Sequence, residues 1–288
     1  MSDVSVIGTG TMGSALVKAF ATSGATVTAW NRTPEKARAL SGPGVHVAES
    51  VAEALRASPL TILSVSDQAI ARSLVEDSGE GLEQKVVASA SFVTPDQGRA
   101  FGAAVSAAGG HYLDLSIPAY PSEVRSGAAV FIISGERAAY EAHRARFETI
   151  GRATYVGGAP AAAFISEMAV LLAYLPMAIG LLQGRRMCEQ QGIPLEWFDE
   201  TVHELYPFHI RSLLERVNKE PDASQRSVEA SVNEWGKTAG EYADYLREVH
   251  LDATVYDALH RMFAKATEAG YGEADWTGIV EHTTERAP

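Results

Sequence analysis

The residues Val4-Ser-Val-Ile-Gly8-Thr-Gly10-Thr-Met-Gly13 combine an apolar stretch, a glycine-rich loop and the start of a segment with helical spacing. The three glycines have GxGxxG spacing. In such a loop Gly8 permits a tight turn, Gly10 lets the backbone approach a pyrophosphate, and Gly13 lets the helix pack closely on the strand. The start of the helix offers free N–H groups to the anion. The loop, including Thr9, Thr11 and Met12, therefore predicts a dinucleotide-binding site.

The end of the second expected strand indicates which dinucleotide is bound. Enzymes that use NAD carry an acid here for the ribose 2′-hydroxyl, whereas this chain has Asn31, followed by Arg32 and Thr33. Without the carboxylate a 2′-phosphate is not repelled, and Arg32, Thr33 and Lys36 can bind it. The alternative is that Arg32 is a solvated surface residue and Thr33-Pro34 only starts a helix. We expect NADPH as the cofactor.

Alternation of short apolar runs and amphipathic segments predicts an α/β first half. The expected strands are Val4 to Ile7, Thr26 to Trp30, Leu60 to Val65, Lys85 to Ser89, Tyr112 to Leu115, Ala129 to Ser134 and Ala153 to Val156. The expected helices between them are Met12 to Thr22, Glu49 to Ala57, Gln68 to Val75, Pro95 to Ala108 and Arg137 to Thr149. We expect the strands to be parallel, with crossover helices.

After Gly157-Gly158-Ala159-Pro160 the chain changes character and predicts long helices: Ala161 to Gln191, Leu195 to Val217, roughly Ser227 to Val249, and Ala253 to Gly270. The expected domains are a dinucleotide-binding domain at 1–158 and a helical domain at 159–288. Because the first long helix is apolar nearly all round, it needs several neighbours, and a second subunit is the expected source of some of them. We expect a homodimer.

Small hydroxyl residues follow two other expected strands. Ligands of open α/β sheets bind at the carboxyl ends of strands, so Ser64, Val65 and Ser66, together with Ser89 and Ser91, are expected near the ribose and nicotinamide. Serine is equally common as a helix N-cap, and for Ser66 and Asp67 that role is the alternative.

Composition narrows the class of protein. The 288 residues carry a net charge of −12, which argues against nucleic acid or an anionic membrane as the main partner. The apolar stretch Met168 to Leu182 falls short of a membrane span and is expected to be a buried helix. A lone cysteine, Cys188, fits a reducing cytoplasm. No metal site is expected, because His203-Glu204 lacks HExxH spacing.

Several motifs together resemble the imine reductases of the β-hydroxyacid dehydrogenase superfamily. They are the loop VIGTGTMG, the turn WNRTPEKA, and the segments Tyr112 to Pro121 and Phe131 to Gly135, followed by an all-helical second half. The resemblance implies an N-terminal Rossmann domain joined by a long interdomain helix to an all-α C-terminal domain. It also implies a dimer with intertwined helical domains, whose active site lies between one subunit's Rossmann domain and the other's helical domain.

The resemblance also implies which residues act in catalysis. Hydroxyacid dehydrogenases of the superfamily carry a lysine on the interdomain helix, but this chain has no lysine between Lys85 and Lys219, and Ser166 or Glu167 lies near the expected position. Imine reductases typically place a proton donor two turns further on. Tyr174 follows Ser166 by eight residues and is the leading candidate. The alternative for Tyr174 is that its ring packs in the core. For Glu167 three roles stay open: a structural helix residue, an acid with a raised pKa, or a carboxylate that holds a protonated amine.

The resemblance, with an aromatic cluster near Pro207, suggests that Tyr120, Tyr206, Trp235 and Thr238 form a substrate pocket for a small, cyclic imine. The alternative for Trp235 is core packing. The alternative for Tyr206 is that it lies at the packed end of a helix that Pro207 interrupts. The expected reaction is hydride transfer from NADPH to a C=N bond. Two other functions stay open: a carbonyl or hydroxyacid oxidoreductase, and an NADPH-binding protein without catalysis.

Overall fold

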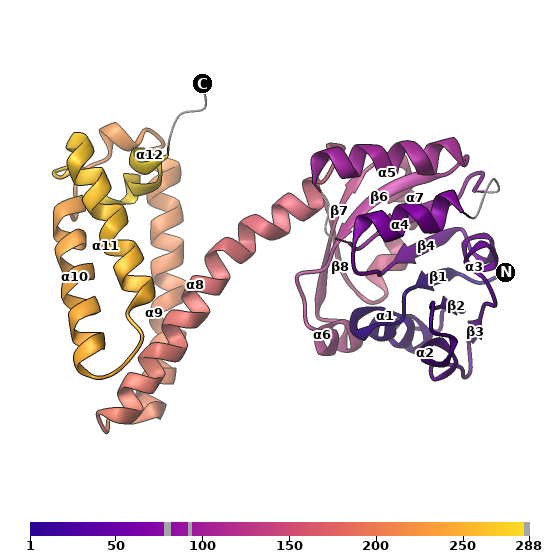
Figure 1. The fold of residues 1–288 in the computed structure, drawn as a ribbon, viewed down its shortest axis with the longest axis horizontal. Coiled ribbons are helices and arrows are strands. Elements are labelled where there is room, and N and C mark those ends of the chain that lie inside the picture. The colour runs from indigo at the N-terminus through magenta and orange to yellow at the C-terminus, as the bar shows by residue number, and fades with distance from the viewer. Residues whose placement is uncertain (78–81, 92–93, 285–288) are drawn as a thin grey trace. The chain divides into compact units, whose positions relative to one another are not determined.

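The computed structural model describes residues 1–77, 82–91 and 94–284. The chain forms two compact units, Met1–Ala173 and Tyr174–Pro288. One long helix, α8 (Ala162–Gln190), contributes to both units (Figure 1). The domain limits expected from the sequence, 1–158 and 159–288, stay a prediction.

The first unit is built on a single sheet. Within the described residues its strands are β1 (Val4–Ile7), β2 (Val27–Trp30), β3 (Val45–Val47), β4 (Leu60–Leu63), β5 (Val86–Ser89), β6 (His111–Ser116), β7 (Ala129–Gly135) and β8 (Gly151–Tyr155). They lie in the order β3-β2-β1-β4-β5-β6-β7-β8. The order reverses between β1 and β4, so the carboxyl ends of these two strands form the crevice where open α/β sheets bind ligands.

Helices cover both faces of this sheet (Figure 1). They are α1 (Thr11–Thr22), α2 (Pro34–Arg38), α3 (Val51–Ala57), α4 (Gln68–Glu76), α5 (Pro95–Ala107), α6 (Pro121–Ser126) and α7 (Arg137–Glu148). One apolar core includes Leu16 and Phe20 of α1 and Phe147 of α7. A second core, which contains Leu55 of α3 and Phe101 of α5, lies on the other side of the strands. The central strands are therefore buried on both faces, as their continuous apolar runs require.

The second unit is helical. After the later part of α8 it contains α9 (Leu195–Lys219), η1 (Ala223–Gln225), α10 (Val232–Glu248), α11 (Thr254–Ala266), η2 (Thr267–Tyr271), η3 (Trp276–Gly278) and α12 (Ile279–Thr283). Its buried apolar clusters are small; the larger one joins Val232 and Ala239 of α10 to Phe263 and Ala266 of α11. The predicted fold class is confirmed: a Rossmann-like sheet domain, a long helix, and an all-helical C-terminal region.

Three details differ from the sequence-based expectations. Strand β7 is antiparallel to β6, whereas all strands were expected to be parallel. The short strand β3 was not predicted, because its three residues give too short a pattern to detect. The connection between β6 and β7 is only the short helix α6 and its flanking turns, which reverse the chain instead of crossing over it.

The expectation of a buried helix at Met168 to Leu182 is wrong for the single chain. Helix α8 is long and apolar enough to cross a membrane by length and composition, and none of its most apolar window is buried within the chain. Leu172 and Leu182 are 69% and 70% exposed. The sequence pattern shows that α8 is apolar, but a single chain does not supply the neighbours that would bury it.

Candidate active site

The glycine loop lies at the carboxyl end of β1, where the sheet order reverses. Gly8 has a φ of +93°, and a Cβ there would lie 2.2 Å from the carbonyl oxygen of Ser64. A Cβ on Gly13 would lie 1.8 Å from the carbonyl oxygen of Gly8, whereas a Cβ on Gly10 would meet no atom within 4 Å. Thus Gly8 and Gly13 are needed for packing, and the space beside Gly10 is open for a ligand.

The polar groups of this loop suit an anion. Gly10 is the N-cap of α1 and makes no side-chain capping hydrogen bond to the first turn of that helix. The buried Thr9 Oγ1 has no hydrogen-bond partner among the described residues. Free N–H groups at the start of a twelve-residue helix and an unused hydroxyl are what a pyrophosphate requires. The loop therefore fits a dinucleotide on its own geometry.

Asn31 connects the glycine loop to the turn after β2. Its Oδ1 accepts a hydrogen bond from the Thr9 backbone N–H at 2.9 Å, and its Nδ2 donates to the Thr33 carbonyl at 3.1 Å. The side chain at the cofactor-selecting position is thus held by two backbone groups. This side chain carries no negative charge.

A cavity of about 300 Å³ lies over the glycine loop and this turn. Its lining contains most of the predicted cofactor residues: Gly8, Gly10, Asn31, Arg32, Thr33, Lys36, Ser64, Val65 and Ser66. Arg32 and Lys36 are exposed, and neither forms an ion pair within residues 1–77, 82–91 and 94–284. Both cations are therefore available to a phosphate at the adenosine end of a dinucleotide.

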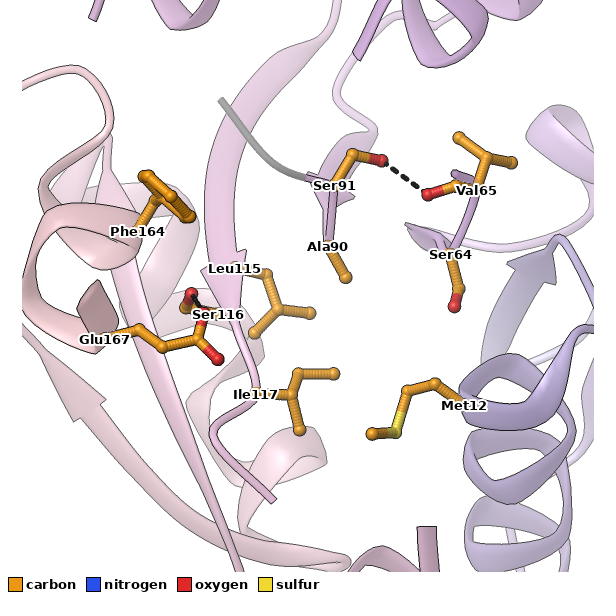
Figure 2. A pocket seen from close by; sticks show the side chains of 10 residues that line it. All are labelled: Met12, Ser64, Val65, Ala90, Ser91, Leu115, Ser116, Ile117, Phe164 and Glu167. Carbon is orange, nitrogen blue, oxygen red and sulfur yellow. Dashed lines mark hydrogen bonds between the residues drawn. The ribbon is translucent and has the colours of Figure 1, made fainter. Parts of the chain in front are cut away.

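A second cavity, of about 380 Å³, lies further along the same edge of the sheet (Figure 2). It shares Ser64 and Val65 with the first cavity, so one elongated ligand can span both. It is lined by Met12, Ser64, Val65, Ala90, Ser91, Leu115, Ser116, Ile117, Phe164 and Glu167. Ser91 donates a hydrogen bond to the Val65 carbonyl at 3.1 Å, which ties the ends of β4 and β5 together (Figure 2).

Glu167 is the only charged side chain in the described lining of this second cavity. Ser116, at the end of β6, donates a hydrogen bond to its Oε2. The sheet thus holds the carboxylate of a residue that comes from α8, and Figure 2 shows the two side chains meeting at one wall of the cavity. An apolar cavity with one oriented carboxylate favours a positively charged group over an anion.

Ser116 and Asp114 were not among the predicted site residues. Both lie on β6 and are buried, and alternate residues of a strand face the same side. Burial raises the pKa of the Asp114 carboxyl to about 6, and the nearby Glu167 charge acts in the same direction. The sequence does contain a signal for Asp114: it lies between two leucines inside a predicted strand, and a buried acid is rarely found without a partner or a role.

Other predicted residues lie outside both cavity linings. Ser89 is fully buried and donates to Gln68 Oε1 at 2.9 Å. Ser166 is half-buried, Thr11 is exposed, and Tyr120 is 65% exposed at the start of α6. Their roles stay predictions. By contrast, Asp67 caps α4 by accepting from the Ile70 N–H at 2.9 Å, so the capping alternative is confirmed for that residue.

The remaining candidates belong to the second unit. Tyr174 and Tyr206 are 40% and 38% exposed. Trp235 packs against Trp276 with ring centroids 5.5 Å apart, and Thr238 is half-buried one turn further along α10. Their assignment to the proton-transfer step and the substrate pocket stays a prediction. The described residues contain no group of three or more His, Cys, Asp or Glu that would hold a metal ion.

A doubly wound sheet with a glycine loop at its switch point defines a dinucleotide-binding domain. The family model for the NAD binding domain of 6-phosphogluconate dehydrogenase matches residues 3–158, more than half of the 288 residues. The chain belongs to this family.

Three proteins are similar to this chain at low sequence identity. An NADPH-dependent reductive aminase from Aspergillus oryzae is 26% identical over 182 residues, which are 63% of this chain and 62% of that protein. The chain thus spans less than two thirds of that relative's length. Glyoxylate/succinic semialdehyde reductase 1 from Arabidopsis thaliana is 23% identical, with 97% of each chain aligned. The structure of an imine reductase from Myxococcus stipitatus in complex with NADP⁺ is 27% identical with a TM-score of 0.84, and the match covers 98% of this chain and all of that one.

Proposed function

We propose that this protein is an NADPH-dependent oxidoreductase that reduces the C=N bond of a small cyclic imine or iminium ion to an amine. The observation that carries this proposal is the second cavity, where the carboxylate of Glu167 lies across from Met12 of the glycine loop and the described lining contains no lysine (Figure 2). The reductive aminase and the imine reductase among the relatives support the same reaction class.

The charge of the cavity favours an imine over a carbonyl. When bound, NADPH supplies the hydride. Hydride addition to a neutral carbonyl builds negative charge on oxygen, which the carboxylate of Glu167 opposes. A protonated imine is positively charged and loses that charge when its carbon accepts the hydride. A neighbouring carboxylate favours the protonated form, which is the better hydride acceptor. Glu167 is thus assigned to hold the substrate nitrogen, with Ser116 orienting its carboxylate.

Tyr174 is the proposed proton donor for a neutral imine, and Ser166 and Glu167 are the alternatives on α8. This assignment rests on the spacing along the helix and on the resemblance to imine reductases. NADPH is the proposed cofactor because Asn31 carries no charge and Arg32 and Lys36 have no ion-pair partner in the described residues.

A cytoplasmic homodimer with intertwined helical domains is also proposed. The exposed apolar side chains of α8 support it, as does α9, which buries no residue within its own chain. Leu172 on α8 and Phe208 on α9 are 69% and 64% exposed, a degree of apolar exposure that water disfavours.

The test is NADPH oxidation with a panel of five- and six-membered cyclic imines. Wild-type protein is expected to turn over at least one of them. Glu167→Gln is expected to lower kcat/KM about ten- to hundred-fold, which corresponds to the ~1.5–3 kcal/mol of a hydrogen bond to a charged group. Glu189→Gln makes the same change at an exposed position on α8 that pairs with Arg186, and is expected to leave kcat/KM unchanged.

Tyr174→Phe belongs in the same assay and is expected to slow reduction of neutral imines more than that of permanently charged iminium ions, which need no proton. Equal rates in Tyr174→Phe and wild type would refute only the role of Tyr174. Absence of turnover by the wild type on every imine would refute the proposed function.

A second candidate is reduction of a small aldehyde or keto acid, because the glyoxylate/succinic semialdehyde reductase aligns along nearly the whole chain. It requires a group in the cavity that binds a carboxylate, and the described lining contains no cation. NADPH oxidation with glyoxylate or succinic semialdehyde, faster than with any imine, would favour this candidate.

A further inference from the structure

Asp114 is an acid in the middle of β6 and is only 1% exposed. One of its oxygens, Oδ1, has no hydrogen-bond partner among the described residues. An acid buried at this depth needs compensation, because removing a carboxylate from water is costly. Its other oxygen shows where that compensation comes from.

Asp114 Oδ2 accepts hydrogen bonds from the backbone N–H of Phe164 and from the Ser134 hydroxyl, both at 3.3 Å. Ser134 lies directly opposite Asp114 in the register of β6 and β7. Its hydroxyl oxygen in turn accepts from the backbone N–H of Ala163 at 3.0 Å. Two strands of the sheet thus satisfy the two N–H groups that follow the first residue of α8.

The neighbouring N–H groups are satisfied locally, by Ala162 donating to the Ala159 carbonyl and Ile165 donating to the Ala161 carbonyl. The N–H groups of Ala162, Ala163 and Phe164 precede the first i→i−4 hydrogen bond of the helix, and these contacts give each of them a partner. The charge of Asp114 also faces the positive end of the helix dipole. Asp114 and Ser134 therefore cap α8 from a distant part of the sequence.

The same strand contacts α8 a second time, because Ser116 of β6 donates to Glu167. Phe164 and Glu167 are three residues apart, which is about one helical turn. Strand β6 thus fixes both the first turn of α8 and the carboxylate that this turn carries into the cavity. Glu167 on α8 and Tyr112 on the same strand interact electrostatically with Asp114, and Arg99 and Arg137 line the cavity on which Asp114 borders.

We propose that Asp114 is a positioning residue, which anchors the first turn of α8 to the sheet and so keeps Glu167 in place in the cavity. The proposal rests on the proposed function for its kinetic consequence, but the anchoring itself is independent of any activity. Asp114 is not assigned contact with the substrate or the cofactor.

The experiment compares Asp114→Ala with Asp114→Asn, which keeps one oxygen acceptor for the Phe164 N–H. Hydrogen exchange is measured for the peptide covering 160–168, together with the NADPH dissociation constant and kcat/KM for a cyclic imine. Asp114→Ala is expected to speed exchange of this peptide about ten-fold, the usual effect of a lost cap. It is also expected to lower kcat at least ten-fold, since small displacements of a reacting group are costly. The NADPH dissociation constant should change less than two-fold.

Asp114→Asn is expected to restore slow exchange and most of kcat. Ser50→Ala is the matched control, because Ser50 caps α3 of the same sheet by accepting from the Glu53 N–H at 3.1 Å. It should loosen α3 and leave kcat unchanged.

Unchanged exchange in Asp114→Ala would overturn the proposed anchor. Faster exchange with unchanged kcat in an active enzyme would overturn its link to Glu167. Wild-type protein without imine turnover would instead refute the proposed function, and the exchange measurement would still test the anchor.

Discussion

Replacing Asp114 with Asn is expected to change how the stability of the protein depends on pH. In the folded protein, burial raises the pKa of the Asp114 carboxyl from 3.8 to about 6, although the hydrogen bonds from the Phe164 N–H and the Ser134 hydroxyl act in the opposite direction. Because the folded-state pKa is raised, ionised Asp114 lowers stability. This cost is complete above about pH 6 and disappears as the pH falls below the unfolded-state value of 3.8.

The size of the effect follows from the shift. Each pKa unit corresponds to about 1.4 kcal/mol, so the cost of ionised Asp114 is about 3 kcal/mol at neutral pH. Asn carries no charge at any pH. The free energy of unfolding of Asp114→Asn, minus that of wild type, should therefore rise by about 2 kcal/mol between pH 4 and pH 7, because part of the cost is already present at pH 4. A new buried amide hydrogen without a partner would add a constant offset, but it would not change this slope.

The assay is urea unfolding followed by far-ultraviolet circular dichroism at several pH values and one protein concentration. Titrating groups that do not interact with Asp114 are common to both proteins and cancel in the difference. If the two stability curves run parallel from pH 4 to pH 7, Asp114 does not titrate near 6, and the account of its burial is refuted.

Two further predictions concern the cofactor loop. Gly13→Ala should destabilise the first unit strongly, because its Cβ would lie 1.8 Å from the Gly8 carbonyl oxygen. Gly10→Ala should keep the melting temperature but weaken NADPH binding, because its Cβ would enter the open space beside the loop. Thermal melts with and without NADPH separate the two effects, and equal melting temperatures for both variants would contradict this account. Arg32→Ala should raise the NADPH dissociation constant about ten-fold or more and leave the NADH dissociation constant unchanged. The control is Arg38→Ala, which removes an exposed partner of Glu35 and should change neither dissociation constant. Equal loss of NADPH and NADH affinity in Arg32→Ala would show that Arg32 does not bind the 2′-phosphate.

Much of the fold could be predicted because its signals are local. The apolar run before Gly8 and the helical spacing after Gly13 are written within a few residues, and β1 and α1 follow them closely. The end of β2 likewise places Asn31 and Arg32 by sequence distance alone. A motif whose parts are adjacent in the chain gives both the fold and the cofactor side of the site.

The substrate side of the site could not be predicted in the same way, because its contacts join distant segments. Asp114 and Phe164 are fifty residues apart, and the Ser116–Glu167 contact joins residues that are fifty-one apart. The antiparallel β7 depends on how a short connection turns, which strand composition does not encode. The exposure of Leu172 could not be predicted either, because the sequence pattern shows only that the residue is apolar and not whether other residues cover it.

The two hydrogen bonds of Asn31 have a consequence for redesigning coenzyme preference. An Asp at this position would still accept from the Thr9 N–H, so the glycine loop would keep its support. It would lose the donor to the Thr33 carbonyl, and its new charge would lie next to that oxygen. Under the proposed preference for NADPH, the Asp would repel the 2′-phosphate and would also loosen the turn that carries Arg32. Discrimination between the two coenzymes and the shape of the turn are therefore coupled through a single amide group, and an engineered variant would have to rebuild both.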